Sequence, residues 1–176
     1  SGVVAFDEAY VDFGGKSALE FLDRHPNVVV VRTMSKAFGL AGVRLGYAFG
    51  SAHVIDSLYK IKDSYNVDLL TQVAGCAALD AWDEYAAVNL ETAARRDRVA
   101  DALRGRFGWH VWPSATNFVL ATPLDADAVV IARRLKTERI LVRHFGQERL
   151  NRSLRISIGS EPEMNRFLDV LEQVVG

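Results

Sequence analysis

Hydrophobic residues in the first third of the chain gather in short runs. Residues 28–31 are four consecutive valines, and residues 3–6 and 45–49 form two further apolar runs. A continuous β-branched run is typical of a strand that is buried on both faces in a mainly parallel sheet. The pattern therefore predicts three strands. It also places an expected ligand site beyond the second, since ligands of open α/β sheets bind outside the carboxyl ends of the strands.

The middle of the chain has helical patterns. Ser51 is positioned to cap a helix that ends at about Lys62, and residues 17–20 have the spacing of a capping box for a short helix that stops at His25 and Pro26. The alanine-rich segment 68–107 contains no proline and predicts either two successive helices or one long bent helix. This segment should bridge two domains.

From residue 109 onward the pattern predicts a small α+β domain. Strands are expected at 109–112, 117–121, 140–145 and 153–158, with a helix at 125–137. A capping box at 160–163 opens a last helix. The side chains that should face the core of this domain are Ala128, Ile131, Ala132, Leu135, Met164, Phe167, Leu168, Leu171, Val174 and Val175. The predicted division is 1–66, part of a large domain; 67–108, bridging helices; and 109–176, the small domain.

Composition and charge narrow the class of protein. With 21 basic and 22 acidic residues the net charge is −1, which gives no electrostatic reason to expect nucleic acid or membrane partners. No apolar stretch approaches the roughly 18 residues that cross a bilayer, and no export signal is visible, so we expect a cytoplasmic protein. Cys76 lies among small residues and is expected to be buried. The histidines lack the spacing of metal ligands, so no metal site is expected.

Chemically distinctive residues follow the first two predicted strands. Asp7 and Tyr10 come after the first, Ser35 and Lys36 come after the valine run, and Arg44 returns eight residues after the lysine. A lone Ser-Lys pair would most simply be a solvated loop. Here the two strand ends converge on one sheet edge, which favours a ligand site. The lysine and the arginine would repel each other unless an anion lay between them.

These residues belong to motifs that resemble a known family. The sequence D-E-A-Y at 7–10, followed by T-M-S-K-A-F-G-L-A-G-V-R at 33–44, resembles the pyridoxal-phosphate aminotransferases of fold type I and, among them, the histidinol-phosphate aminotransferases. The likeness continues at 64–67, 113–118 and 154–159 and corresponds to the second half of such an enzyme. It implies an α/β fold class: part of the mainly parallel sheet of the large domain, followed by a small α+β C-terminal domain.

The resemblance implies a role for each residue of the motifs. Lys36 would hold pyridoxal 5'-phosphate covalently and act as general base and acid. Asp7 would pair with the ring nitrogen of the cofactor, and Tyr10 would hydrogen-bond its ring hydroxyl. Ser35 and Arg44 would bind its phosphate.

Two arginines in the C-terminal part are candidate substrate ligands. Arg155 lies in the apolar segment 154–158, where an unpaired guanidinium is costly to bury, so an anionic partner is expected. The resemblance implies that this partner is the substrate α-carboxylate. Arg143 resembles the arginine that binds the substrate phosphate. A structural salt bridge is the alternative, because Arg143 is followed by His144 where the family more commonly has aspartate.

The implied reaction is transamination of histidinol phosphate with 2-oxoglutarate by a homodimeric enzyme. The alternatives are another enzyme of this fold, such as an aromatic aminotransferase or a threonine-phosphate decarboxylase, and a non-catalytic domain that is truncated or senses a ligand. A non-catalytic domain that had lost its function long ago would be expected to have lost these site residues. The chain retains Asp7, Lys36, Arg44 and Arg155. The 176 residues alone are expected to be inactive, because in the family the first half supplies phosphate-binding amides and an aromatic side chain that stacks on the cofactor.

Overall fold

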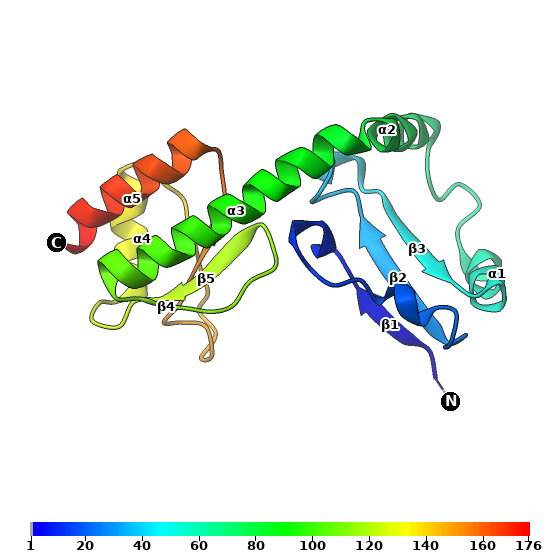
Figure 1. Cartoon of the computed structure of the whole chain (residues 1–176), viewed down its shortest axis with the longest axis horizontal. Helices are drawn as coiled ribbons and strands as arrows, with labels where there is room; N and C mark the ends of the chain where they lie inside the picture. The colour runs from blue at the N-terminus through cyan, green and yellow to red at the C-terminus, as the bar shows by residue number, and fades with distance from the viewer. Residues whose placement is uncertain (1) are drawn as a thin grey trace. The chain divides into compact units, whose positions relative to one another are not determined.

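The computed structural model of the protein describes residues 2–176 and divides into two compact units, Ser1–Asn89 and Leu90–Gly176 (Figure 1). The division falls inside helix α3, Trp82–Phe107. Each unit has its own sheet. The three-part domain division at residues 66 and 108 stays a prediction.

The first unit contains a three-stranded sheet in the order β1–β2–β3. Strand β1 (Val4–Asp7) pairs in parallel with β2 (Val28–Thr33), and β2 pairs antiparallel with β3 (Gly46–Gly50). The strands match the predicted apolar runs to within two residues. Because β1 and β2 are parallel, their carboxyl ends reach the same edge of the sheet.

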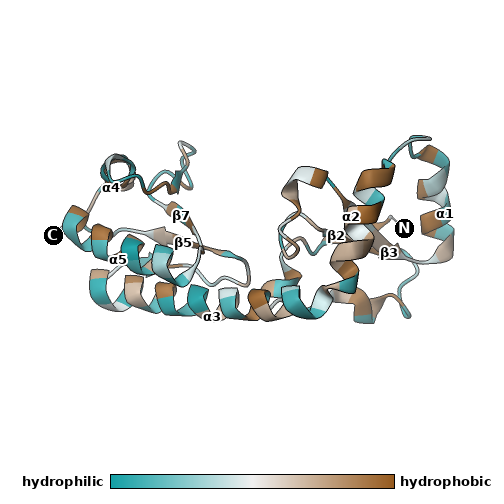
Figure 2. Cartoon of the chain, turned by 90° about the horizontal axis from the view of Figure 1, so that it is seen from above, coloured by the Kyte–Doolittle hydropathy of each residue, from teal (hydrophilic) through white to brown (hydrophobic). Residues whose placement is uncertain are grey.

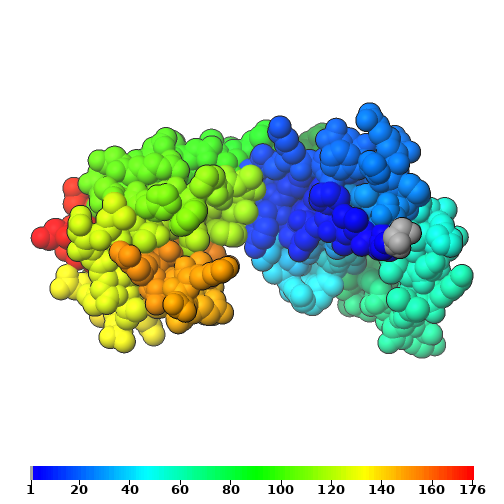
Figure 3. All heavy atoms as spheres, turned by 90° about the horizontal axis from the view of Figure 1, so that it is seen from below, coloured from blue at the N-terminus to red at the C-terminus, as the bar shows by residue number. Residues whose placement is uncertain are grey.

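The strands of this sheet differ in burial. Val28, Val29 and Val30 of β2 are buried, whereas all four residues of β1 are exposed. In Figure 3 the residues of β1, drawn in dark blue, lie uncovered at the surface. Burial on both faces is therefore confirmed for the start of β2, whereas the described residues leave β1 uncovered. Among residues 2–176, β1 has a strand partner on one side only.

Two predicted helix starts in the first unit differ in detail from the structure. Ser17 caps only a 3₁₀ helix, Ala18–Phe21, and the predicted helix up to residue 25 is wrong. The Glu8 carboxylate accepts hydrogen bonds from the Ser17 hydroxyl and the Ala18 amide at the start of this 3₁₀ helix. Helix α1 begins after Ser51 as expected, but the Ser51 hydroxyl donates to the Pro26 carbonyl at 2.7 Å instead of capping it.

The helices that follow β3 have the predicted order. Helix α1 spans Ala52–Ile61, helix α2 spans Leu69–Asp80, and α3 begins at Trp82. The helical segment is thus two successive helices with a break at Ala81. Asp68 caps α2 by accepting a hydrogen bond from the Thr71 amide at 3.0 Å, and its hydrogen bonds with Thr71 hold the pKa of Asp68 below its ordinary value. Among residues 2–176, no helix combines the length and apolar character needed to cross a membrane.

Cys76 on α2 is exposed, so the prediction of a buried residue is wrong. The buried residues of α2 are Gly75 and Ala78, and Cys76 lies about 100° around the helix from Gly75. The buried side of α2 is defined by close packing. A Cβ atom on Gly75 would lie 2.6 Å from the Leu45 side chain, so a larger residue at this position would force that side chain to shift.

The second unit contains a four-stranded antiparallel sheet in the order β4–β5–β7–β6. The strands are β4 (His110–Val111), β5 (Phe118–Thr122), β6 (Arg143–His144) and β7 (Leu154–Ser157). All four lie where strands were predicted, although β4 and β6 are only two residues long.

Helices α4 (Ala128–Thr137) and α5 (Glu161–Val175) complete the second unit. Helix α4 begins three residues later than predicted, because the Asp127 carboxylate caps it by accepting from the Val129 amide at 2.7 Å. The capping box of α5 is confirmed. Both the amide and the hydroxyl of Ser160 donate to the Glu163 carboxylate at 2.7 Å, and these hydrogen bonds lower the pKa of Glu163.

The core of the second unit lies between its sheet and its helices. Helix α5 shows its apolar positions as brown bands among teal ones in Figure 2. Ala132 and Leu168 are only partly buried, and Val175 is 38% exposed in the last turn, so its predicted burial is wrong. The predicted core residues that are buried are Ala128, Ile131, Leu135, Met164, Phe167, Leu171 and Val174. Helix α3 adds Val99, Ala100 and Leu103.

Candidate active site

Tyr10 and Lys36 lie together beyond the carboxyl ends of β1 and β2. The Lys36 Nζ atom is 5.5 Å from the centre of the Tyr10 ring. Asp7 is the last residue of β1 and is paired in register with Val31. Its carboxylate accepts a hydrogen bond from the Ala9 amide at 3.0 Å, which turns the chain toward Tyr10. A phenol, an amine and a carboxylate are thus carried by two adjacent strand ends.

Buried neighbours fix the turn that carries Lys36. Met34, Ala37 and Phe38 are packed in a small core, whereas Ser35 is half-buried and Lys36 is exposed. The Met34 amide donates to the Leu45 carbonyl at 3.0 Å, which ties the turn to the start of β3. The alternation of buried and exposed positions directs the Lys36 side chain toward solvent.

Of the two phosphate-binding candidates, Ser35 lies in this turn and Arg44 follows it in the chain. The Ser35 amide donates to the Thr33 hydroxyl at 3.1 Å. Arg44 follows the 3₁₀ helix Ala41–Val43 and has a left-handed backbone, with φ of 54°. Its guanidinium donates to the Ala41 carbonyl at 3.3 Å and forms no ion pair within residues 2–176.

Asp7, Lys36 and Arg44 are exposed charges without an ion-pair partner in the described part of the chain. An amine can bond to a carbonyl carbon, a carboxylate can hold a protonated ring nitrogen, and a guanidinium can bind a phosphate through two parallel hydrogen bonds. The chemistry of this set fits a ligand that carries all three groups. Within residues 2–176, no three His, Cys, Asp or Glu side chains gather closely enough to hold a metal ion.

Glu8, which the sequence analysis did not select, anchors the segment between Asp7 and Tyr10. It is buried, and its carboxylate lies 2.9 Å from the guanidinium of Arg32 and accepts a hydrogen bond from the Ser17 hydroxyl at 3.0 Å. The Glu8 amide also donates to the Val31 carbonyl at 2.8 Å. An arginine inside the valine-rich strand was the sequence signal that could have revealed this pair, because a buried guanidinium requires an acidic partner.

An aromatic ring and one further carboxyl group lie near the Arg32 side of the Glu8–Arg32 pair. The Arg32 guanidinium lies 5.7 Å from the centre of the Phe49 ring. Burial raises the pKa of Asp12 above its ordinary value, although the nearby Arg32 charge acts in the opposite direction. The segment from Asp7 to Tyr10 is therefore held by a partly buried network of charges.

Glu8→Gln is expected to destabilise the first unit by roughly 1.5–3 kcal/mol, the usual value of a hydrogen bond to a charged group. The substitution keeps the size of the side chain but leaves the Arg32 charge without a partner. Denaturant unfolding of the variant and of wild type measures the difference. Glu20→Gln, at an exposed position outside the network, is the matched control and should unfold like wild type. Equal stability of both variants would show that the buried pair contributes nothing.

In the second unit, Arg143 and Arg155 lie directly opposite each other on β6 and β7. The Arg155 Nε atom is buried and has no hydrogen-bond partner in residues 2–176. Its guanidinium lies 5.2 Å from the centre of the Phe118 ring. Arg143 is exposed and makes no salt bridge within the described chain. Like charges at opposed positions destabilise a sheet, so this pair favours an anionic ligand.

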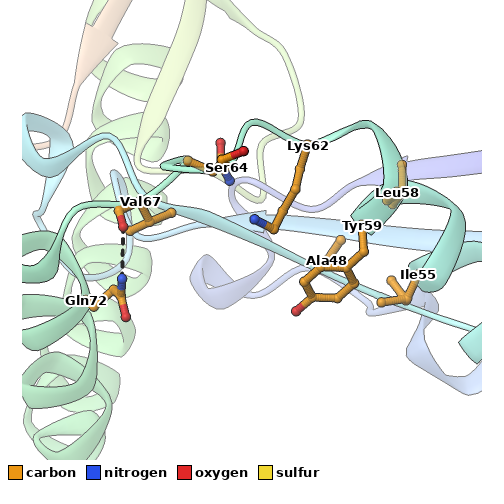
Figure 4. A pocket seen from close by; sticks show the side chains of 9 residues that line it. Ala48, Ile55, Leu58, Tyr59, Lys62, Ser64, Val67 and Gln72 are labelled. Atoms are coloured by element: carbon orange, nitrogen blue, oxygen red, sulfur yellow. Dashed lines mark hydrogen bonds between the residues drawn. The ribbon is translucent and has the colours of Figure 1, made fainter.

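The seven candidate residues thus fall into two groups. Asp7, Tyr10, Ser35, Lys36 and Arg44 belong to the first unit, and Arg143 and Arg155 belong to the second. None of the seven lines the cavity of about 550 Å³ in the first unit that is shown in Figure 4. The polar side chains of that cavity are mostly exposed, and the Gln72 amide is engaged with the Val67 carbonyl at 2.9 Å.

Residues 1–171 match the family of aminotransferases of class I and II, and the chain belongs to this family. It is similar to histidinol-phosphate aminotransferase 2 of Burkholderia mallei, with 44% identity over 99% of this chain and 50% of that protein. Among solved structures it is similar to histidinol-phosphate aminotransferase from Sinorhizobium meliloti in complex with pyridoxal 5'-phosphate. There the TM-score is 0.83 and the identity 34%, over 98% of this chain and 48% of that one.

A third similarity concerns the fold alone. L-threonine-O-3-phosphate decarboxylase from Porphyromonas gingivalis has a TM-score of 0.82 at 21% identity, over 96% of this chain and 54% of that one. The chain spans about half the length of the relatives that it matches. The comparisons confirm the family resemblance and the fold class, fold type I with a small α+β C-terminal part.

Proposed function

We propose that the complete protein is a pyridoxal-phosphate-dependent aminotransferase that converts histidinol phosphate and 2-oxoglutarate into imidazole acetol phosphate and glutamate. The observation that carries the proposal is the exposed Lys36 amine beside Tyr10, beyond two parallel strand ends, in a motif of the aminotransferase family. The names of the similar proteins support the choice of substrate.

The residues of the first unit would hold the cofactor. Lys36 would bond to its aldehyde carbon, Asp7 would keep its ring nitrogen protonated, and Tyr10 would donate to its ring hydroxyl. Ser35 and Arg44 would bind its phosphate. When bound, pyridoxal phosphate supplies a conjugated ring that accepts the electron pair left by removal of the substrate α-proton.

Lys36 would also carry out the proton transfer. As a free amine, Lys36 would take the proton from the substrate α-carbon and later return it as a general acid. The turn that is fixed by Met34, Ala37 and Phe38 keeps this amine on the solvent side of the strand end. The negative charge of Asp7 favours the protonated ring nitrogen, which strengthens electron withdrawal.

Arg155 would bind the α-carboxylate of 2-oxoglutarate and of amino-acid donors, and Arg143 would bind the phosphate of histidinol phosphate. Arg155→Ala in the complete enzyme is expected to weaken the binding of every amino-acid substrate by about ten- to a hundredfold, because a charged hydrogen-bonded contact with the carboxylate is lost. Arg143→Ala should weaken phosphorylated donors selectively. Steady-state kinetics with histidinol phosphate and with an unphosphorylated aromatic amino acid measures both effects.

The exposed Arg152 of the second unit provides the control, since Arg152→Ala should leave the steady-state kinetics with both donors unchanged. Equal losses for the two donors in Arg143→Ala would contradict the phosphate role. The assay also tests the reaction itself. Glutamate formation supports transamination, release of carbon dioxide would indicate a decarboxylase, and preference for aromatic amino acids would indicate an aromatic aminotransferase. Ligand binding without turnover would indicate a sensing domain.

We further propose that the complete protein is a homodimer in the cytoplasm. Leu69, Leu70 and Val73 of α2 are 72%, 79% and 59% exposed, and a partner that covered these side chains would remove a large apolar area from water. Sedimentation equilibrium of the complete protein tests the dimer, and a monomer at all concentrations would contradict it.

A further inference from the structure

The Phe145 ring lies near both arginines of the second unit. Its ring centre is 5.5 Å from the Arg143 guanidinium carbon and 6.0 Å from that of Arg155. The residue before it, His144, is fixed by β6 pairing with Leu154 and by a 2.7 Å hydrogen bond between its Nε2 atom and the Asn151 carbonyl oxygen. Phe145 therefore follows an anchored strand end.

The ring compensates for charges that no carboxylate in the described chain neutralises. Arg143 and Arg155 occupy opposed positions on β6 and β7, so their charges repel. The face of an aromatic ring carries partial negative charge and attracts a guanidinium within about 6 Å. One ring that attracts both side chains restricts their rotamers, which would otherwise separate the two charges.

We propose that Phe145 is a positioning residue that holds Arg143 and Arg155 at a spacing that lets both guanidinium groups face the anionic group of the bound substrate. This inference deepens the proposed function and rests on it for the identity of the substrate. Phe145 acts through the two arginines and needs no contact with the reacting atoms. Its substitution should therefore affect binding more than turnover.

The test uses the complete protein loaded with cofactor, so that the phosphate site of the cofactor is filled. The binding of inorganic phosphate is measured by calorimetry for wild type and for Arg143→Ala. Only the binding that is lost in Arg143→Ala is counted as binding at this site. Phe145→Leu should raise the dissociation constant for phosphate and the KM for the amino donor by about five- to thirtyfold, with kcat changed by less than about threefold. Phe145→Tyr keeps the ring and should stay within about twofold of wild type.

A matched control exists in the same unit. The Arg106 guanidinium carbon lies 5.4 Å from the centre of the Phe107 ring, but Arg106 already has an ion-pair partner in Glu172 at 2.7 Å. Phe107→Leu removes a ring of the same kind at the same distance from an arginine. Phosphate binding and KM should not change in this variant. If Phe145→Leu does not fold, as judged by circular dichroism, Phe145→Met gives a second side chain without a ring.

The outcomes separate this inference from the proposed function. A folded Phe145→Leu or Phe145→Met protein with wild-type phosphate binding and KM would overturn the role of Phe145 and leave the proposed reaction standing. The same would follow if Phe145→Tyr lost as much binding as Phe145→Leu, or if wild type bound no phosphate through Arg143. Selective loss of phosphate binding in a protein that does not transaminate would support Phe145 and contradict the proposed reaction.

Discussion

Lys36→Ala in the complete protein is expected to lower the rate of transamination by at least about 10²–10⁴-fold, the usual contribution of a positioned general acid–base group. The alanine variant has no amine to bond to the cofactor and none to move the substrate α-proton. Turnover under saturating substrate and cofactor measures the loss. The turn residues Met34 and Phe38 are unchanged, so the variant should keep its fold.

Chemical labelling with the cofactor identifies the reacting lysine directly. After incubation of wild type with pyridoxal phosphate and reduction with borohydride, the label should be found on Lys36. Lys16, Lys60 and Lys62 are also exposed and serve as internal controls for non-specific labelling. Label on one of these with Lys36 unmodified, or a Lys36→Ala enzyme with wild-type turnover, would refute the assignment.

The position of Lys36 could be predicted because its determinants are local. The four valines at 28–31 predict β2, and the strand ends just before Ser35 and Lys36. The continuous β-branched run indicated a mainly parallel sheet, and the parallel pairing of β2 with β1 across residues 8–27 brings Asp7 to the same edge. The roles of these residues came from the family motifs and not from the strand pattern.

Arg32 in the valine-rich strand signals an acidic partner, but the sequence does not identify Glu8 as that partner, because the contact spans 24 residues of sequence. Glu8 stands in the family motif next to Asp7, and the pattern gives no sign that its carboxylate turns inward. The exposure of Cys76 could not be predicted from local sequence either. Its small neighbours indicated burial, but the direction in which it points depends on how α2 packs through Gly75 and Ala78.

The arrangement around Phe145 depends on strand register. Periodicity predicted strands at 140–145 and 153–158, and register pairs Arg143 with Arg155. A shift of one residue would move every side chain of β6 to the other face of the sheet. The contact of one ring with two guanidinium groups is therefore a property of the fold that no local pattern contains.

The 176 residues alone are expected to show no transamination and to self-associate. All of β1 is exposed, its outer edge has no strand partner within residues 2–176, and Val3 and Val4 are 63% and 48% exposed. Unpaired strand edges and apolar side chains promote pairing with other molecules. Lys36 could still react with pyridoxal phosphate, but an incompletely enclosed site loses the fixed geometry and the exclusion of water on which catalysis depends.

Leu70→Glu tests whether exposed apolar side chains drive self-association. Leu70 is 79% exposed, so its replacement removes no buried contact. The isolated Leu70→Glu chain should associate less than the unsubstituted chain in sedimentation velocity and should unfold at the same temperature. Glutamate formation from histidinol phosphate and 2-oxoglutarate should be undetectable for both, under conditions in which the complete enzyme turns over. Turnover by the isolated chain comparable to that of the complete enzyme would show that these residues already hold the cofactor and substrate in their reactive geometry. A monodisperse, monomeric isolated chain would show instead that the exposed strand edge and α2 surface do not drive association.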